Sequence, residues 1–178
     1  YLHMEYGPFG AGHQHEDKLS IVVHAFGERL LTEGGVYAYD SSQWRRYVLS
    51  TRAHNTIMVD GMEQHRRGLA ATYVTEEALP NRWFSNDEFD FAEGWFDEGY
   101  GRERDRTVTH RRAVVFVKPR YWLVVDRLSP ADDRVHRYDA MFHFDTEAAR
   151  ESGEPRAVLS GDGEGPSLAV VPLNPDAV

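Results

Sequence analysis

Apolar residues in this chain recur in short runs that alternate with polar residues and end at turn-forming residues. Alternation with a period of two is typical of β-strands, because successive side chains point to opposite faces of a strand. The pattern predicts strands at residues 19–26, 29–31, 55–59, 108–118, 121–128, 136–144, 157–159 and 168–171. Asp60-Gly61 predicts a tight hairpin turn, and Pro119-Arg120 a second turn. Only residues 42–49 are compatible with a short helix.

Many short strands separated by Gly, Pro, Asn and Asp turns predict an all-β fold, an antiparallel β-sandwich. We expect helix in less than about a tenth of the residues, well below the usual share. A chain of 178 residues, 41% of them hydrophobic, can form one sizeable core, so we expect a single domain over residues 1–178. Residues 151–166 are rich in Gly, Glu and Pro and predict a flexible loop.

The net charge of −9 argues against a nucleic-acid or anionic-membrane partner. No apolar run approaches the roughly 18 residues that would span a membrane. The absence of cysteine excludes a disulfide scaffold and a thiolate metal site. Charge is uneven along the chain. Residues 44–67 hold five arginines against Asp60 and Glu63, a local charge of +3, and residues 86–98 hold six acidic residues without Lys or Arg. These arginines are either solvated surface residues or a substrate-facing cluster.

Two histidines, His13 and His15, lie two residues apart just before the first long apolar run. On an extended backbone they would share one face, where their ring nitrogens either serve two neighbouring roles or bind one cation. Glu33 and His54 add a carboxylate and another imidazole, each beside an apolar run. His15, Glu33 and His54 together suit the tetrahedral N/O preference of zinc and leave a fourth position for water or another ligand.

The sequence segments around these residues carry a wider resemblance. The segments are GPFGAGHQHEDKLS at residues 7–20, AFGERLLTEGGVYAY at 25–39, STRAHNTIMVDG at 50–61, RRAVVFVKPRYWLVVD at 111–126 and YDAMFHF at 138–144. Together they resemble the heparinase II/III-like family, polysaccharide lyases that act on uronate-containing chains such as heparan sulfate and alginate. The resemblance is dense over residues 1–67, thinner up to residue 144, and absent from the tail. It implies a C-terminal β-sandwich domain that follows an N-terminal helical toroid in a longer polypeptide.

The resemblance implies that His15, Glu33 and His54 bind zinc, chiefly to orient the neighbouring loop. The acidic ligand is usually Asp in the family, so Glu33 is a departure that changes the reach of the carboxylate. Asp17 is expected to brace a histidine or the following turn. The remaining histidines with a strand context (His24, His110, His136 and His143) are expected to be structural or surface residues.

The chemistry implied by the resemblance is β-elimination: a base removes the C5 proton of a uronate, and an acid protonates the departing O4. His13 matches a family histidine that faces the substrate, and Tyr39, ahead of Tyr37, is the candidate acid or acid/base. Arg45 would bind a carboxylate, while Trp44 would stack on a sugar face. The alternatives are half-buried sandwich tyrosines and a core tryptophan.

The implied partners are a uronate-containing polysaccharide and the toroid of the same polypeptide, and the implied location is the periplasm or exterior of a bacterium. Because the toroid supplies one wall of the cleft, we expect the isolated domain to cleave poorly or not at all. Two other functions are open. One is a non-catalytic carbohydrate-binding or structural sandwich in which zinc only links two strands, and the other is a cupin-type metalloenzyme. The cupin alternative is disfavoured, because Leu19, Ser20 and Ile21 stand where its glutamate is expected.

Overall fold

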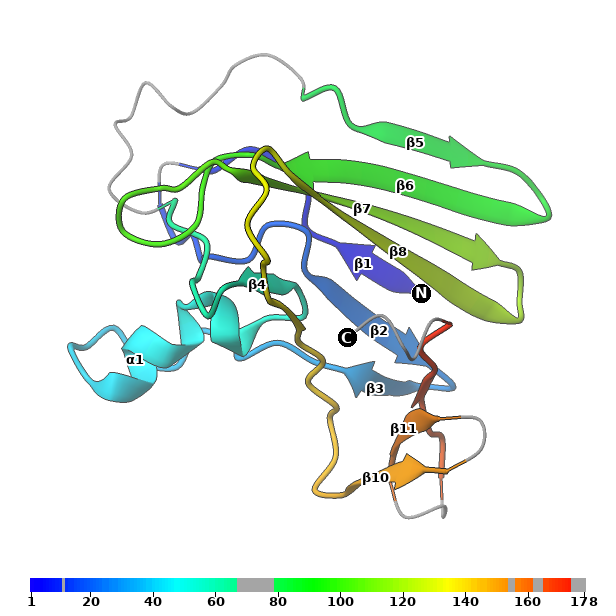
Figure 1. Cartoon of the computed structure of the whole chain (residues 1–178). Coiled ribbons are helices and arrows are strands. Elements are labelled where there is room, and N and C mark those ends of the chain that lie inside the picture. Colours follow the sequence, from blue (N-terminus) through cyan, green and yellow to red (C-terminus); the bar gives the residue numbers. More distant parts are fainter. Residues whose placement is uncertain (11, 67–78, 154–155, 162–164, 174–178) are drawn as a thin grey trace.

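The computed structural model of the chain describes residues 1–10, 12–66, 79–153, 156–161 and 165–173 (Figure 1). Helix in these residues is limited to α1 (Gln43–Val48) and the 3-10 turn η1 (Thr51–Ala53). None of the described helices is long and apolar enough to cross a membrane. The predicted fold class, nearly all β with one short helix at residues 42–49, is confirmed.

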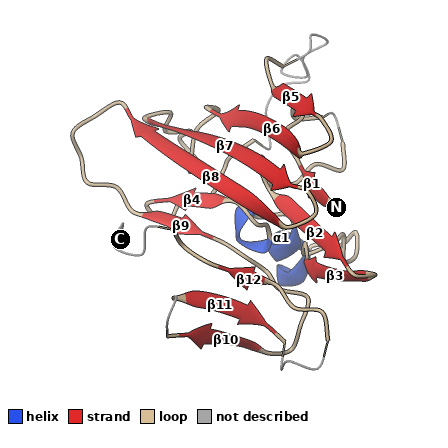
Figure 2. Ribbon diagram, turned by 90° about the vertical axis from the view of Figure 1, so that its right-hand side faces the viewer, coloured by secondary structure: helices blue, strands red, loops and turns tan. Residues whose placement is uncertain are grey.

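Among the described residues, the strands form four antiparallel sheets, and in each sheet neighbouring strands follow one another in chain order. They are β1 (Leu2–Met4), β2 (Ile21–Ala25) and β3 (Glu28–Leu31); β5 (Arg82–Ser85), β6 (Phe89–Phe96), β7 (Val108–Val117) and β8 (Tyr121–Pro130); β4 (Ile57–Val59) and β9 (Tyr138–Ala140); and β10 (Ala149–Ser152), β11 (Ala157–Ser160) and β12 (Ala169–Val170). The large β5–β8 sheet lies over the β1–β3 and β4–β9 sheets, and β10–β12 lie to one side (Figure 2).

One apolar core joins the two layers. The β5–β8 sheet contributes Ala92, Phe96, Val108 and Val114, and the facing layer contributes Met4, Ile21, Val23, Leu30, Leu31, Ile57 and Val59, all buried. Burial alternates along the first half of β7, as a strand with one face on a core requires. A shared core between two antiparallel layers is the arrangement of a β-sandwich.

The β7–β8 hairpin was expected at residues 108–118 and 121–128, and the structure confirms it. Its inner face also holds two polar side chains, His110 and Arg112, each fully buried. Both contact Asp126 of β8: His110 Nε2 lies 2.7 Å from it, and Arg112 makes two hydrogen bonds to it, of 2.7 and 2.9 Å. A partly buried carboxylate therefore neutralises a buried guanidinium inside the sandwich.

Other strand predictions needed correction. The β5–β6 hairpin lies where only an acidic stretch was noted. An acidic residue such as Glu93 can lie within β6 because Arg82 and Arg111 pair with it. Of the strand expected at residues 136–144, only β9 pairs regularly, with β4. Asp60 and Gly61 do form a tight turn, with φ of 54° and 71°, that brings Met62 back onto Val59.

The loop expected at residues 151–166 is largely a hairpin. Glu151 and Ser152 end β10, and β11 pairs with it in register through Ser152 and Ala157. Ala157 and Ser160 are buried, so the second strand contributes to packing despite the Gly- and Glu-rich composition around it. Residues 154–155 and 162–164, on which part of that prediction falls, lie outside the described residues.

Candidate functional site

The loop between β1 and β2 carries both histidines of the His13-Gln14-His15 segment. His13 has a φ of 60°, so the backbone is not extended there and the two side chains do not share one face as a strand would place them. The Nδ1 of His13 lies 3.0 Å from the hydroxyl of Tyr39. The ring of His15 instead lies against that of His54, with centroids 5.3 Å apart. The pair therefore serves two neighbouring groups of residues.

His54 is the buried centre of the first group. It follows η1 and is 1% exposed. Glu33 contacts its Nδ1 through one carboxylate oxygen, and the other oxygen accepts a hydrogen bond from the hydroxyl of Ser20. The Nε2 of His54 is buried and has no hydrogen-bond partner within the described part of the chain. A buried nitrogen in this state is costly unless something else binds it.

Ligand atoms of His15, Asp17 and His54 lie within 4.8 Å of one another, and no other such group of three occurs among the described residues. Glu33 is outside this group but touches His54. Of the three residues expected to hold zinc, the structure places His15 and His54 in this group, but Asp17 takes the position expected for Glu33, and Glu33 instead braces His54. Two imidazoles and one carboxylate beside a buried nitrogen fit the ligand preference of zinc.

Tyr39 is the centre of the second group. It lies in the segment before α1, and its side chain is 71% exposed, next to His13. The guanidinium of Arg45, in α1, lies 4.8 Å from the centre of the Tyr39 ring, and its Nη1 donates to the carbonyl oxygen of Val36 at 2.5 Å. Ser42 caps α1 by accepting from the backbone N–H of Arg45. Three segments thus place an imidazole, a phenol and a guanidinium together at the surface.

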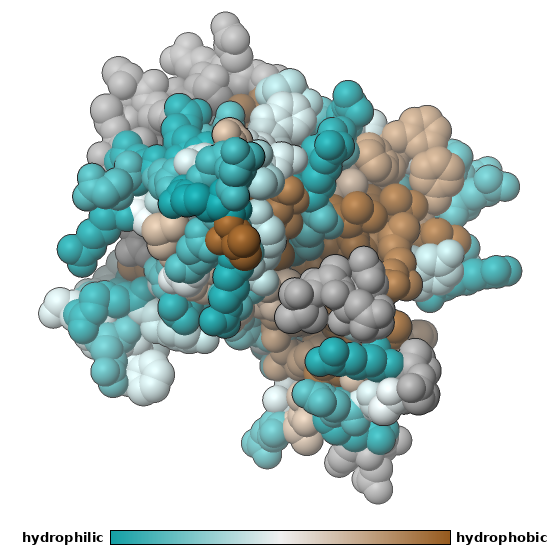
Figure 3. Space-filling model, in the orientation of Figure 1, coloured by the Kyte–Doolittle hydropathy of each residue, from teal (hydrophilic) through white to brown (hydrophobic). Residues whose placement is uncertain are grey.

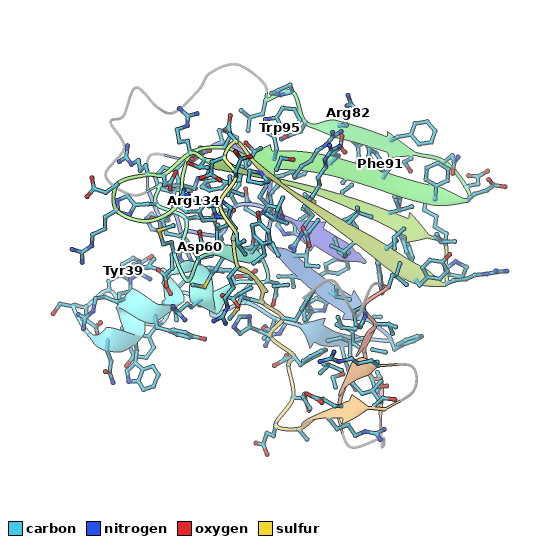
Figure 4. All side chains as sticks on the ribbon, viewed as in Figure 1. Tyr39, Asp60, Arg82, Phe91, Trp95 and Arg134 are labelled. Carbon is cyan, nitrogen blue, oxygen red and sulfur yellow. The ribbon has the colours of Figure 1, made fainter. Side chains whose placement is uncertain are left out.

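Tyr37 and Trp44 lie near this group but outside it. Tyr37 has a φ of 56° and is 58% exposed, so it is not the half-buried sandwich residue that was the alternative. Trp44, in α1, is 56% exposed, which excludes the core alternative for its indole. Figure 4 shows Tyr39 beside the α1 ribbon, at the edge of the molecule. Both aromatic residues are therefore available to a ligand, although the ring and hydrogen-bond contacts of His13 are with Tyr39.

Asn55, which the sequence did not single out, holds the metal-site segments in place. Its backbone N–H donates to the hydroxyl of Ser20 at 2.8 Å, and its side-chain amide donates to the carbonyl oxygens of Ile21 and Thr32 at 2.7 and 2.6 Å. The hydroxyl of Ser20 donates to the Glu33 carboxylate, and Thr32 directly precedes Glu33 in the chain. A fully buried Asn directly after His54 is the signal that could have suggested this role.

Two buried cations secure the loop of His13 and His15. The Lys18 ammonium donates to the carbonyl oxygen of Tyr6 at 3.0 Å, and burial lowers the pKa of Lys18 to about 8. Arg66 pairs with Glu98 at 2.9 Å and lies over the ring of Phe9, with 4.8 Å to its centroid. The arginines of residues 44–67 were expected to be either solvated surface residues or a substrate-facing cluster. Arg66 is neither, since it is 1% exposed and pairs this basic stretch with Glu98 of the acidic stretch at residues 86–98.

Comparison with known proteins places these features in a family. Residues 1–174 match the family model described as heparinase II/III-like, C-terminal. The heparin-sulfate lyase of Pedobacter heparinus is 23% identical over 124 residues, covering 67% of this chain and 16% of that protein. The crystal structure of heparan sulfate lyase HepC from Pedobacter heparinus superposes with a TM-score of 0.74 at 20% identity, covering 98% of this chain and 26% of that one. A heparinase III structure gives a TM-score of 0.66 at 19% identity, covering 89% and 23%.

The structural similarities, at 20% identity and below, show a shared fold. The chain spans 16% of the length of the curated relative and about a quarter of the length of the solved ones. The family model, in contrast, covers nearly the whole chain and includes every residue of the two groups described above. The chain therefore belongs to the heparinase II/III-like family, whose C-terminal domain it represents.

Proposed function

We propose that the whole protein containing this chain is a polysaccharide lyase that cleaves a uronate-containing glycan by β-elimination. The observation that carries the proposal is the 3.0 Å contact between the Tyr39 hydroxyl and His13 Nδ1, at an exposed position beside the Arg45 guanidinium. An imidazole and a phenol in direct contact can exchange a proton, which is the requirement for a paired acid and base. Relatives named as heparin-sulfate and heparan sulfate lyases support the same substrate class.

In the proposed reaction, neutral His13 takes the C5 proton, and the C–H electron pair forms the C4–C5 double bond as the C4–O4 bond breaks. Tyr39 donates its proton to the departing O4. The proton on His13 then returns to Tyr39 through their hydrogen bond, which restores both groups. Arg45 binds the uronate carboxylate and stabilises the negative charge that develops beside C5. Trp44 and Tyr37, both exposed, provide surfaces for the neighbouring sugar rings.

We further propose a zinc ion in the His54 group, held by His15, Asp17 and the Nε2 of His54, with Glu33 bracing His54 through its Nδ1. The support is the buried Nε2 of His54, which has no hydrogen-bond partner among the described residues, together with the N/O character of the three ligand side chains. When bound, the cation would tie the loop of His15 to the segments of Glu33 and His54 and so hold the adjacent His13 in place. Its role is chiefly structural.

The rest of the cleft belongs, in this proposal, to a helical toroid of the same polypeptide, which is exported to the periplasm or secreted. The described groups supply an acid, a base and one carboxylate-binding arginine on a single open surface. Catalysis requires the substrate to be held in register with both groups, so one wall alone should lose most of the rate.

The test is formation of the unsaturated uronate product, followed by ultraviolet absorbance, from heparan sulfate, alginate and hyaluronan. The whole protein should form product from at least one of them, and the 178-residue chain should form little or none. Robust product from the chain alone would show that it carries a complete site. No product from the whole protein on any uronate polymer would support a binding or structural sandwich instead.

A further inference from the structure

The outer face of the β5–β8 sheet is solvent-accessible and carries an ordered set of side chains. Its residues alternate with the buried ones, so Trp95 of β6, Arg111 of β7 and Arg127 of β8 point away from the core. The strand register places Trp95 opposite Arg111, and Arg111 opposite Arg127. These three side chains therefore form a row across the sheet. Arg82 of β5 lies in the next row, opposite Glu93.

The row contains an unfavourable pair. Two like charges directly opposite on adjacent strands destabilise a sheet, because their β-carbons are only about 4.5–5.5 Å apart. Arg111 is drawn toward Glu93 at 2.6 Å, and Arg82 also lies 3.4 Å from that carboxylate. Arg127 is exposed, and no ion pair is found for it among the described residues. Glu93, which is 6% exposed, thus pairs with two arginines. Three arginines and one glutamate give this face a local charge of +2, on a chain of net charge −9.

Apolar residues continue this face toward the hairpin turns. The row beyond Arg82 consists of Phe84, Phe91, Val115 and Leu123 in register. Figure 3 shows apolar side chains gathered at the turn end of this sheet. Figure 4 places Arg82, Phe91 and Trp95 along the large sheet, away from Tyr39. The face therefore carries cations and an indole at one end and apolar side chains at the other, separate from the candidate catalytic group.

We propose that this face is a second glycan-binding site, which takes an anionic polysaccharide of the class assigned under the proposed function. Arg111 and Arg127 bind its carboxylate or sulfate groups, for which a guanidinium offers paired N–H donors. The half-buried indole of Trp95 offers a flat apolar surface to the adjoining sugar ring. An anion between the two arginines removes their mutual repulsion, so charge complementarity selects this occupant over a neutral one.

The experiment measures binding of a heparan sulfate oligosaccharide to the whole protein by calorimetry, at low and at physiological salt. Arg127→Gln should weaken binding about ten-fold, the loss expected for one charge-assisted hydrogen bond. Arg127→Lys should retain only part of the affinity, since the positive charge remains but the paired N–H donors are lost. Arg150→Gln, an exposed arginine of β10 outside this sheet, is the matched control and should bind as the unmodified protein does.

The same affinity for Arg127→Gln and Arg150→Gln would overturn the proposal, as would equal competition by a neutral glucan. Affinity and product formation are measured separately for each variant, so the two proposals can fail separately. A whole protein without lyase activity whose affinity still depends on Arg127 would refute the proposed function and support this site. Normal turnover with no dependence of affinity on Arg127 would support the proposed function and refute this site.

Discussion

Arg112 donates a hydrogen bond of 2.5 Å to the carbonyl oxygen of Asn55, and so ties the β7–β8 hairpin to the residue that follows His54. The same Nη1 donates to the carbonyl oxygen of Leu19 at 2.8 Å. Arg112 is fully buried, and Asp126 accepts its remaining hydrogen bonds. One guanidinium therefore connects the large sheet to both segments that border the candidate metal site.

Asp126→Asn should lower the free energy of unfolding by about 3–5 kcal/mol, because it leaves Arg112 buried without a counter-charge. Burial alone would raise the pKa of Asp126, but hydrogen bonds from His110 and Arg112 outweigh it and hold the pKa well below its usual range. A depressed carboxyl pKa stabilises the fold above the unfolded value, and this contribution is lost as pH falls through the folded value. Urea denaturation at neutral pH measures the change.

The control for this variant is Asp97→Asn, at a half-exposed carboxylate that lies 3.8 Å from Arg106. Such a surface pair contributes at most about 1 kcal/mol. If both variants lower the free energy of unfolding equally, the Arg112–Asp126 pair does not stabilise the segments that border the candidate metal site.

Protein purified without chelator should contain one zinc ion per chain, and His54→Ala should lose it. The reason is that His54 is the residue common to all contacts of the group. Elemental analysis gives the zinc content, and chelation should lower the thermal unfolding midpoint of the unmodified protein but not that of His54→Ala. His24→Ala, which removes an imidazole stacked on Tyr1, is the control and should keep its zinc. Full zinc content in His54→Ala would remove this residue from the site.

Glu33→Gln and Asp17→Asn distinguish the roles of the two carboxylates near His54. Each substitution keeps the size of the side chain and removes a negative charge, so both should weaken zinc binding, by about 10–100-fold for a carboxylate that orients a ligand and by more for a direct ligand. We expect the larger loss for Asp17→Asn, since Asp17 lies in the ligand group with His15 and His54, whereas Glu33 contacts the Nδ1 of His54. Competition with a chromogenic chelator measures the affinities. Unchanged affinity in both variants would show that no carboxylate takes part.

His136 should stabilise the fold more at low pH than at high pH. Hydrogen bonds to Asp132 and Asp60, at 2.8 and 2.7 Å, raise the pKa of His136. A raised folded pKa gives a contribution that is fully present below the ordinary value and is lost as pH rises through the folded value. The thermal unfolding midpoint of His136→Gln should thus differ from that of the unmodified protein more at about pH 5 than at about pH 9. A pH-independent difference would contradict this.

Much of the fold could be predicted because strand periodicity is local. The β7–β8 hairpin has alternating apolar positions and a clear turn. The β5–β6 hairpin was missed, because the acidic residues of β6 mask its alternation, and their partners lie on other strands. Arg66 could not be placed either. Its burial depends on Glu98, 32 residues away, and sequence does not show that pairing.

The sequence marked candidates for the site but not their geometry. The family resemblance pointed to His13, Tyr39 and Arg45, and the structure brings these three together. The two histidines would share one face only on an extended backbone, which the positive φ of His13 excludes. The presence of Asp17 beside His54 depends on how the loop folds back, and the spacing of residues along the chain does not contain that information.

The most direct test of the central claim compares Tyr39→Phe with Tyr37→Phe in the whole protein on its best uronate substrate. Each variant loses only a hydroxyl, but only the Tyr39 hydroxyl contacts His13. Product formation should fall by about a hundred-fold or more in Tyr39→Phe, the usual contribution of a positioned acid or base, and by far less in Tyr37→Phe. Turnover by Tyr39→Phe at the rate of the unmodified enzyme, with the fold intact by circular dichroism, would contradict the claim that Tyr39 and His13 carry the elimination.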